Sequence, residues 1–282
     1  MSAHKGEKLN WLVANLPEGL IVDAAWLRTH GYAANLLAKY VQAGWLEQPV
    51  HRVYTRPRGP LVWEQAVISL QTLLARDLVL GGRSALDLHG HAHYMHQDTT
   101  VVYLYGPEPP PTWLAKLPAG VEFRYRNDAR LFERSRASTA PHDLAADPAK
   151  LTSSSGTAAV PWGQWRWPLV VSTPERAVLE FLNELPDNES FHQADMLIEG
   201  LSTLRPPRLQ ALLADCRSIK VKRLFFFLAD RHQHAWLKRI DRTKIDLGRG
   251  KKSLVRGGRY DAKYMITVPG DLDGSGRIGG RT

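Results

Sequence analysis

Cysteine is nearly absent from this sequence, because Cys216 is the only one among 282 residues. A single cysteine excludes a disulfide within the chain, and it excludes zinc and iron–sulfur sites built from several cysteines. Cys216 ends an apolar run that starts at Leu209, so we interpret it as a small buried side chain. The composition is typical of a reducing compartment, and we expect a cytoplasmic protein.

Long apolar runs are also absent. A membrane-spanning helix needs roughly 18 or more consecutive apolar residues, and no stretch of the sequence approaches that length. The segment from Met1 to Lys8 has no apolar core of the kind that secretory signal peptides contain. We therefore expect no membrane partner.

The common catalytic signatures are missing too. The sequence contains no Gly-x-Ser-x-Gly elbow, no His-Glu-x-x-His helix and no Glu-x-Lys pair that could complete a nuclease carboxylate cluster. The Gly-rich stretches that begin at Gly81 and Gly248 lack the spacing of a phosphate-binding loop. We predict that the protein is not an enzyme and uses no cofactor, with a nuclease as the alternative.

Two segments resemble metal sites without completing one. Four histidines lie close together in the first segment: His89, His91, His93 and His96. A glycine interrupts them and no cysteine lies nearby, so we interpret them as packing residues. Residues 271–276 match the start of a calcium loop, but its twelfth position is Thr282 and not the bidentate Glu. We predict no metal site.

Charge is abundant but unevenly distributed. Residues 61–204 contain 11 Lys and Arg against 17 Asp and Glu, whereas residues 205–263 contain 17 Lys and Arg against 5 Asp and Glu. A surface as basic as the second segment attracts a polyanion or an acidic partner, although a solvated helix face is the alternative. Within this segment we predict a partner-binding group, Lys220, Lys222 and Arg223.

Residues 1–60 predict three short helices followed by a β-hairpin. Apolar residues recur at helical spacing from Leu9 to Leu16, and Pro17 stops this first helix. Asp23 is a good N-cap for a second helix that runs to His30. A glycine then supplies the turn that leads into the third helix.

The third helix, predicted from Tyr32 to Ala43, has two different faces. The apolar face consists of Ala33, Leu37, Tyr40 and Val41. The other face is small and polar, and it consists of Asn35, Ala38, Lys39 and Gln42. A recognition helix needs such a division, because its outer side chains must enter a major groove and reach base edges.

The segment from Trp45 to Gly59 predicts a basic wing, with two short strands around a turn at Gln48 and Pro49. Together with the helices it predicts a winged helix-turn-helix that binds double-stranded DNA, with a protein-contact module as the alternative. We expect Asn35, Lys39 and Gln42 to read bases. The full set of residues expected at the DNA is Arg28, Tyr32, Asn35, Lys39, Gln42, His51, Arg52, Arg56 and Arg58.

Residues 61–269 predict a larger mixed unit. Its expected elements are a helix over 61–80, a short helix over 83–89, strands at 101–105 and 121–125, helices at 172–182, 207–216 and 222–230, and a last strand at 264–268. The fold class is thus α+β, with an N-terminal winged helix-turn-helix (1–60), a larger mixed α/β domain (61–269) and a flexible tail (270–282).

Four motifs resemble a known family, the AbiEi antitoxins of type IV toxin–antitoxin systems. They are GGRSALDLHGHAHY (81–94), STPERAVLE (172–180), KVKRLFFFLA (220–229) with HAWLK (234–238), and GGRYDAKYMITVP (257–269). The resemblance extends from the N-terminal winged helix to about Pro269, and the final thirteen residues lie outside it.

The resemblance implies a transcriptional repressor with two domains. The winged helix would bind promoter repeats of its own operon, and the C-terminal domain would counter a partner toxin of nucleotidyltransferase type. In such systems the antitoxin opposes the action of the toxin without necessarily forming a stable complex with it.

Overall fold

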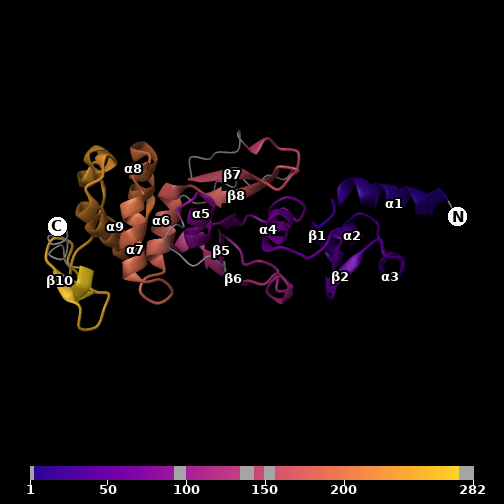
Figure 1. Ribbon diagram of the computed structural model, residues 1–282, viewed down its shortest axis with the longest axis horizontal. Coiled ribbons are helices and arrows are strands. Elements are labelled where there is room, and N and C mark those ends of the chain that lie inside the picture. The colour runs from indigo at the N-terminus through magenta and orange to yellow at the C-terminus, as the bar shows by residue number, and fades with distance from the viewer. Residues whose placement is uncertain (1–2, 92–99, 134–142, 149–155, 273–282) are drawn as a thin grey trace, which may run out of the picture.

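The computed structural model describes residues 3–91, 100–133, 143–148 and 156–272 of the chain. The molecule is elongated, with the N-terminal helices at one end of its long axis and strand β10 at the other (Figure 1). It is a mixed α+β fold in which a smaller N-terminal unit precedes a larger one, as the sequence predicts. No helix in the described ranges is long and apolar enough to cross a membrane.

The N-terminal unit combines three helices with a small antiparallel sheet of strand order β1-β3-β2. Its elements are α1 (Ala3–Asn15), β1 (Ile21–Asp23), α2 (Ala24–Thr29), α3 (Ala34–Gln42), β2 (Glu47–Val50) and β3 (Val53–Thr55). Asp23 caps α2 as predicted, because its Oδ1 accepts from the Trp26 amide at 2.8 Å. Strand β1 was expected only as a short apolar segment, and its pairing with β3 closes the sheet.

The hairpin turn lies three residues later than predicted. Strand β2 runs through Gln48 and Pro49, and the turn is formed by His51 and Arg52, the latter with φ 62°. The prediction of a turn at Gln48 and Pro49 is therefore wrong. Proline is accepted here because β2 is an edge strand, whose outer side needs no backbone N–H donor.

The larger unit is built on a five-stranded sheet of order β6-β5-β4-β8-β7. Its strands are β4 (Val79–Leu80), β5 (Val101–Gly106), β6 (Glu122–Asn127), β7 (Thr157–Trp162) and β8 (Trp167–Ser172). Strands β5 and β6 are adjacent and parallel, which confirms that the two β-rich runs share a sheet. Strands β4, β7 and β8 had no counterpart in the prediction.

Helix α4 (Trp63–Gln71) joins the two units and is much shorter than the helix predicted over 61–80. The Ser69 hydroxyl accepts from the Ile21 amide at 2.9 Å, which ties α4 to β1. The buried Gln71 side chain donates to the carbonyls of Leu78 (2.8 Å) and Val170 (2.9 Å), so α4 ends against the larger sheet. Continuing the helix would remove β4 from that sheet, which explains why the long-helix prediction is wrong.

Helices pack on the sheet and extend the molecule toward its C-terminal end (Figure 1). They are α5 (Gly82–Leu88), α6 (Pro174–Asn183), α7 (Phe191–Gly200), α8 (Pro206–Asp215) and α9 (Ile219–His232). Helices α5 and α6 contact the sheet, and α6 also contacts α7, α8 and α9. The predicted helices at 83–89, 172–182, 207–216 and 222–230 are confirmed with shifted ends.

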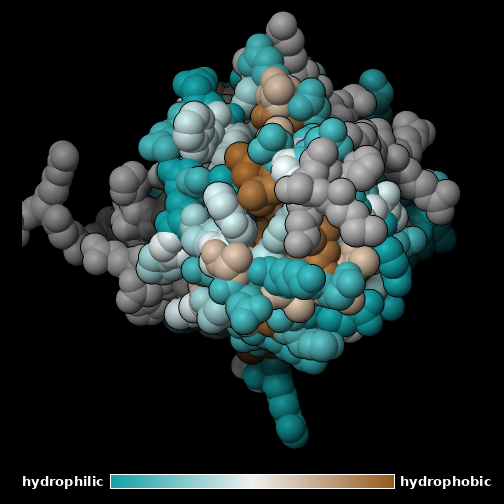
Figure 2. Space-filling view, turned by 90° about the vertical axis from the view of Figure 1, so that its right-hand side faces the viewer, coloured by the Kyte–Doolittle hydropathy of each residue, from teal (hydrophilic) through white to brown (hydrophobic). Residues whose placement is uncertain are grey.

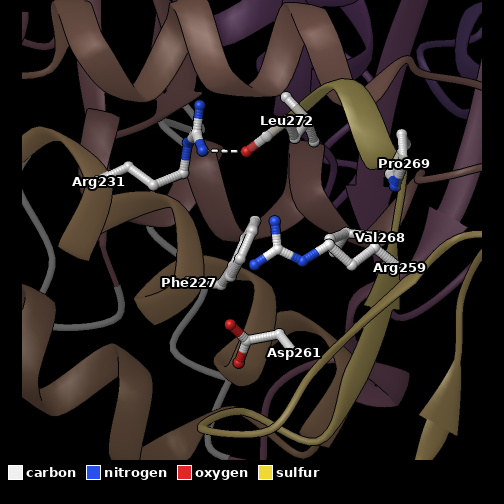
Figure 3. Close-up of a pocket in the computed structure, with 7 residues that line it drawn as sticks. All are labelled: Phe227, Arg231, Arg259, Asp261, Val268, Pro269 and Leu272. Atoms are coloured by element: carbon white, nitrogen blue, oxygen red, sulfur yellow. Dashed lines mark hydrogen bonds between the residues drawn. The ribbon is translucent and has the colours of Figure 1, made fainter. Parts of the chain in front are cut away.

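A second small sheet, of order β10-β11-β9, lies beside α9, because Phe227 and Arg231 of α9 line one pocket with residues of β10 and β11 (Figure 3). Its strands are β9 (Lys252–Ser253), β10 (Arg259–Asp261) and β11 (Ile266–Val268). Short 3₁₀ helices occur along the larger unit, at η1 (Leu114–Lys116), η2 (Asp128–Arg130), η4 (Ala235–Arg239), η5 (Arg242–Lys244) and η6 (Gly270–Leu272). Leu272 is buried, so the predicted flexible tail does not begin at residue 270. Residues 273–282 lie outside the described ranges, as do His93 and His96 of the histidine segment.

Candidate nucleic-acid interface

Helix α3 has one buried side and one exposed side. Leu37 and Tyr40 are buried in the core of the N-terminal unit. Asn35, Lys39 and Gln42 are exposed, as the helical spacing predicts. Ala33 is exposed and not part of the apolar face, because the helix starts after it. The polar face of α3 is thus free to approach a groove.

The corner between α2 and α3 is held by aromatic packing. The ring of Trp11 in α1 lies 5.9 Å from the rings of both Trp26 and Tyr32. Tyr32 is only 3% exposed, and its hydroxyl donates to the Lys8 carbonyl at 2.7 Å. Burial and the neighbouring Tyr40 raise the pKa of Tyr32 to about 12. The prediction that Tyr32 contacts DNA is therefore wrong, since this side chain fixes the helices instead.

The hairpin tip lies beside the start of α2. Arg52 at the tip accepts a hydrogen bond from the Ala24 amide through its carbonyl, at 2.8 Å. The side chains of His51 and Arg52 are exposed, and Arg28 is exposed on α2. The hydrogen bond between Ala24 and Arg52 therefore fixes the tip next to α2. Three exposed side chains that are positively charged or titratable, Arg28, His51 and Arg52, thus lie in the same unit as the polar face of α3.

Arg56 has a structural role that the sequence did not indicate. Its Nη1 donates to the carbonyls of Val13 (3.0 Å) and Leu16 (3.1 Å), and its Nη2 forms an ion pair with Glu18 at 3.1 Å. These contacts satisfy carbonyls at the C-terminal end of α1, where a positive charge is favourable. We therefore correct its assignment as a phosphate ligand.

Arg58 contacts the β7–β8 hairpin of the larger unit. Its guanidinium lies 6.0 Å from the centre of the Trp165 ring. Both residues line a hollow of about 320 Å³ that Val13 and Pro17 also border. Its proposed contact with a DNA phosphate stays a prediction.

The end of the molecule that carries these elements is mainly hydrophilic. Figure 2 views the molecule from its N-terminal end, where polar residues cover most of the visible surface and a smaller apolar area lies near the centre. The apolar residues that remain exposed in this unit include Val13 and Trp45. The surface therefore fits a polar, charged partner better than an apolar one.

The three residues predicted to bind a partner through the C-terminal segment are structural. Lys222 and Arg223 are buried in α9, at 4% and 1% exposure. The Lys220 ammonium donates to the carbonyls of Asn183 (2.7 Å) and Leu185 (2.6 Å), and burial lowers its pKa. Because none of them offers a free charge to solvent, the prediction of a partner site at Lys220, Lys222 and Arg223 is wrong.

The motifs shared with the AbiEi family meet in the interior. Glu180 of the second motif is fully buried, and its Oε2 accepts from the amide of Gly82 in the first motif at 2.9 Å. Its Oε1 accepts from Arg176 Nε at 2.7 Å and from Ser172 Oγ at 3.0 Å. These residues therefore join α5, α6 and β8, which gives the first two motifs a structural role in the interior.

His89 and Cys216 also have structural surroundings. His89 Nε2 is 2.9 Å from the Ser172 carbonyl, in agreement with a packing role. Cys216 is buried, and burial raises the pKa of its thiol to about 11. The described residues contain no cluster of three or more His, Cys, Asp or Glu that could hold a metal ion.

Comparisons with known proteins agree with the motif pattern. A family model for the transcriptional regulator, AbiEi antitoxin, Type IV TA system matches residues 99–269, and a model for the AbiEi antitoxin N-terminal domain matches residues 5–97. The chain is also similar to the crystal structure of the RV2827C protein from Mycobacterium tuberculosis, with 16% sequence identity and a TM-score of 0.50. That match covers 92% of this chain and 88% of the other, and at this identity it shows the fold alone. A search of curated proteins found no match.

Proposed function

Because the chain belongs to the AbiEi antitoxin family of transcriptional regulators from type IV toxin–antitoxin systems, we propose that it represses its own operon by binding double-stranded DNA. Residues 1–60 act as a winged helix-turn-helix, and α3 lies in the major groove. Asn35, Lys39 and Gln42 read base edges, while Arg28, His51 and Arg52 contact phosphates. The boundary at residue 60 is part of this proposal.

One observation carries the proposal. The polar face of α3 is exposed opposite the buried Leu37 and Tyr40, and the hairpin tip is fixed beside α2 by the bond between Ala24 and Arg52. Side chains that can read bases and cations that can hold phosphates are thus presented by neighbouring elements. A helix and a wing divide these two tasks in winged-helix proteins.

A gel-shift assay with the DNA upstream of the operon tests this half of the proposal. We expect Lys39→Ala combined with Arg52→Ala to weaken binding by at least about tenfold, because two phosphate or base contacts are lost. The matched control is Lys116→Ala combined with Arg166→Ala, two exposed cations of the larger unit. Unchanged affinity of the Lys39 and Arg52 variant would remove α3 and the hairpin from the interface and favour the protein-contact alternative.

We further propose that the larger unit opposes a toxin of nucleotidyltransferase type encoded beside this chain. The support is family membership together with the distinct sheets of the two units. Coexpression of the neighbouring reading frame with the full chain should restore growth, and the Lys39 and Arg52 variant should restore it equally well. Failure of the wild-type chain to restore growth would contradict the antitoxin role.

The proposal contains no catalytic step and places the protein in the cytoplasm, where operator DNA and a toxin are both accessible. The alternative of a nuclease has a direct test. Metal-dependent cleavage of DNA by the purified chain, at a rate that Lys39→Ala leaves unchanged, would favour an enzyme.

A further inference from the structure

We propose that the C-terminal end of the molecule binds single-stranded RNA. The side chains that form this surface, which we call the C-terminal basic surface, are Arg249, Lys251, Lys252, Arg256 and Tyr260. All five are exposed, and they belong to β9, β10 and the adjoining loops. Figure 1 places β10 at the opposite end of the long axis from α3, so a duplex on α3 leaves this surface open to a second partner.

The loop that presents these cations is held in place from the interior. Arg223 donates from Nε to the Leu247 carbonyl at 2.6 Å. Its Nη1 donates to the carbonyls of Gly250 (2.7 Å) and Met265 (3.3 Å). The loop is therefore fixed before any partner arrives, which lowers the entropy lost on binding. The sequence predicts that Arg223 binds a partner itself. Arg223 is buried instead, and it supports the loop whose exposed cations belong to the C-terminal basic surface.

The local electrostatics favour an anion. In the described part of the chain, no carboxylate lies within 4.0 Å of the buried Arg223 guanidinium, so its charge adds to that of the exposed cations. Residues 246–261 contain only two carboxylates, Asp246 and Asp261, against five Lys and Arg. Asp246 accepts from the Gly248 amide at 2.7 Å, and Asp261 accepts from the Tyr264 amide at 2.7 Å. The surface thus keeps a positive potential that a phosphate backbone matches.

Tyr260 makes this surface suited to unpaired bases. Arg259 and Asp261 line a pocket of about 190 Å³ next to Phe227 beneath the sheet (Figure 3). Because side chains alternate along a strand, Tyr260 lies on the opposite, outer face of β10. It is 39% exposed, and the Lys251 ammonium lies 5.0 Å from its ring centre. An exposed ring flanked by cations stacks on bases while the cations hold the backbone.

The exposed ring separates RNA from other polyanions. A duplex hides the faces of its bases, and the carboxylates of an acidic protein have no π-face that stacks on the ring. Unpaired bases that can be stacked on aromatic side chains are presented mainly by RNA loops and ends. Single-stranded RNA is therefore the partner that uses both parts of the C-terminal basic surface.

Fluorescence anisotropy with the full chain and a labelled, unstructured RNA of about 12 nucleotides tests the proposal, a length within the usual site sizes for single strands. Lys251→Glu with Lys252→Glu should weaken binding by at least about tenfold, and log Kd should depend on log salt with a slope of roughly 2 for three contacted phosphates. Tyr260→Ala should weaken binding by about fivefold or more, whereas Tyr260→Phe should keep it within about twofold.

Two control variants make the result decisive. Lys238→Glu with Arg239→Glu reverses two exposed charges on η4, and it should leave RNA binding within about threefold because only long-range charge changes. The Lys39 and Arg52 variant should bind RNA like the wild-type chain, which separates this surface from the proposed DNA interface. Each of three outcomes would overturn the proposal. The η4 control could lose as much RNA affinity as the Lys251 and Lys252 variant, Tyr260→Ala could bind RNA like the wild-type chain, or a duplex of the same length could bind more tightly than the single strand.

Discussion

Residues 205–263 are more basic than residues 1–60, yet two of the three cations that we predicted from the sequence to bind a partner in the more basic segment, Lys222 and Arg223, are buried. In the N-terminal unit, Lys39 and Arg52 extend into solvent. In α9, Lys222 and Arg223 are enclosed, and Arg223 donates to backbone carbonyls. Charge density along a sequence therefore indicates the sign of a surface, but the neighbouring apolar residues decide which cations reach that surface.

Arg223→Gln gives the largest expected effect on stability. The variant removes a buried guanidinium and leaves the carbonyls of Leu247 and Gly250 without their donor, so we expect the free energy of unfolding to fall by about 3–5 kcal/mol. Urea unfolding followed by tryptophan fluorescence measures it. The exposed Arg249→Gln should change stability by less than about 0.5 kcal/mol. If the two variants lost similar amounts of unfolding free energy, buried and exposed cations would not differ in their contribution to stability.

Arg56→Ala tests an exception within the N-terminal unit. Its guanidinium donates to the carbonyls of Val13 and Leu16 and forms an ion pair with Glu18, and only 16% of its side chain is exposed. We expect a loss of about 2 kcal/mol in the free energy of unfolding, since a helix end loses its partner. A variant that unfolds like the wild-type chain but binds DNA more weakly would restore Arg56 to the interface.

Acid unfolding should reveal the ion-paired carboxylate of Asp195 in the larger unit. Burial raises the pKa of Asp195, but hydrogen bonds from His232 and Arg231 outweigh burial and lower it to about 2. A lowered pKa means that the carboxylate stabilises the fold above about pH 4, and that this contribution is lost as the pH falls toward 2. After allowance for solvent screening we expect about 1 kcal/mol. Asp195→Asn should remove this part of the dependence, measured by urea unfolding at a series of pH values.

Lys39→Ala should have the smallest effect on stability. The side chain is exposed on α3, so the free energy of unfolding should change by less than about 0.5 kcal/mol while affinity for the upstream DNA falls. Urea unfolding and the gel-shift assay measure the two quantities on one sample. A large loss of stability would mean that Lys39, like Arg223, stabilises the fold. The contrast between exposed cations in the N-terminal unit and buried cations in α9 would then not hold.

Periodic apolar patterns allowed the helices to be predicted, and short mixed runs did not. The faces of α3 and α6 follow from 3.6-residue spacing, and Asp23 was recognised as a cap. Strand β4 was missed because two residues at the end of a long apolar run look helical until the sheet that receives them is known. The turn after β2 was misplaced because Pro49 is typical of turns and also of edge strands.

The candidate site could be predicted where exposure follows from helix geometry, and only there. Asn35, Lys39 and Gln42 lie on the polar face as expected. Tyr32 and Arg56 were assigned to DNA by type, but their partners Lys8 and Val13 are 24 and 43 residues away in the chain. Contacts at that separation depend on tertiary packing, which no local pattern records. The glycines around Arg249 were the one local sign of an ordered basic loop.

Helix α4 couples the two units. The Ser69 hydroxyl accepts from the Ile21 amide in β1, and the Gln71 side chain donates to the Leu78 carbonyl and to the Val170 carbonyl in β8, so the helix is hydrogen-bonded to both units. Severing the exposed backbone near Gly59 would therefore leave two fragments that still diffuse together. In a repressor built this way, the larger unit would keep a fixed orientation relative to the DNA axis. Insertion of half a helical turn between two operator repeats would therefore place the larger units of neighbouring copies on opposite sides of the duplex.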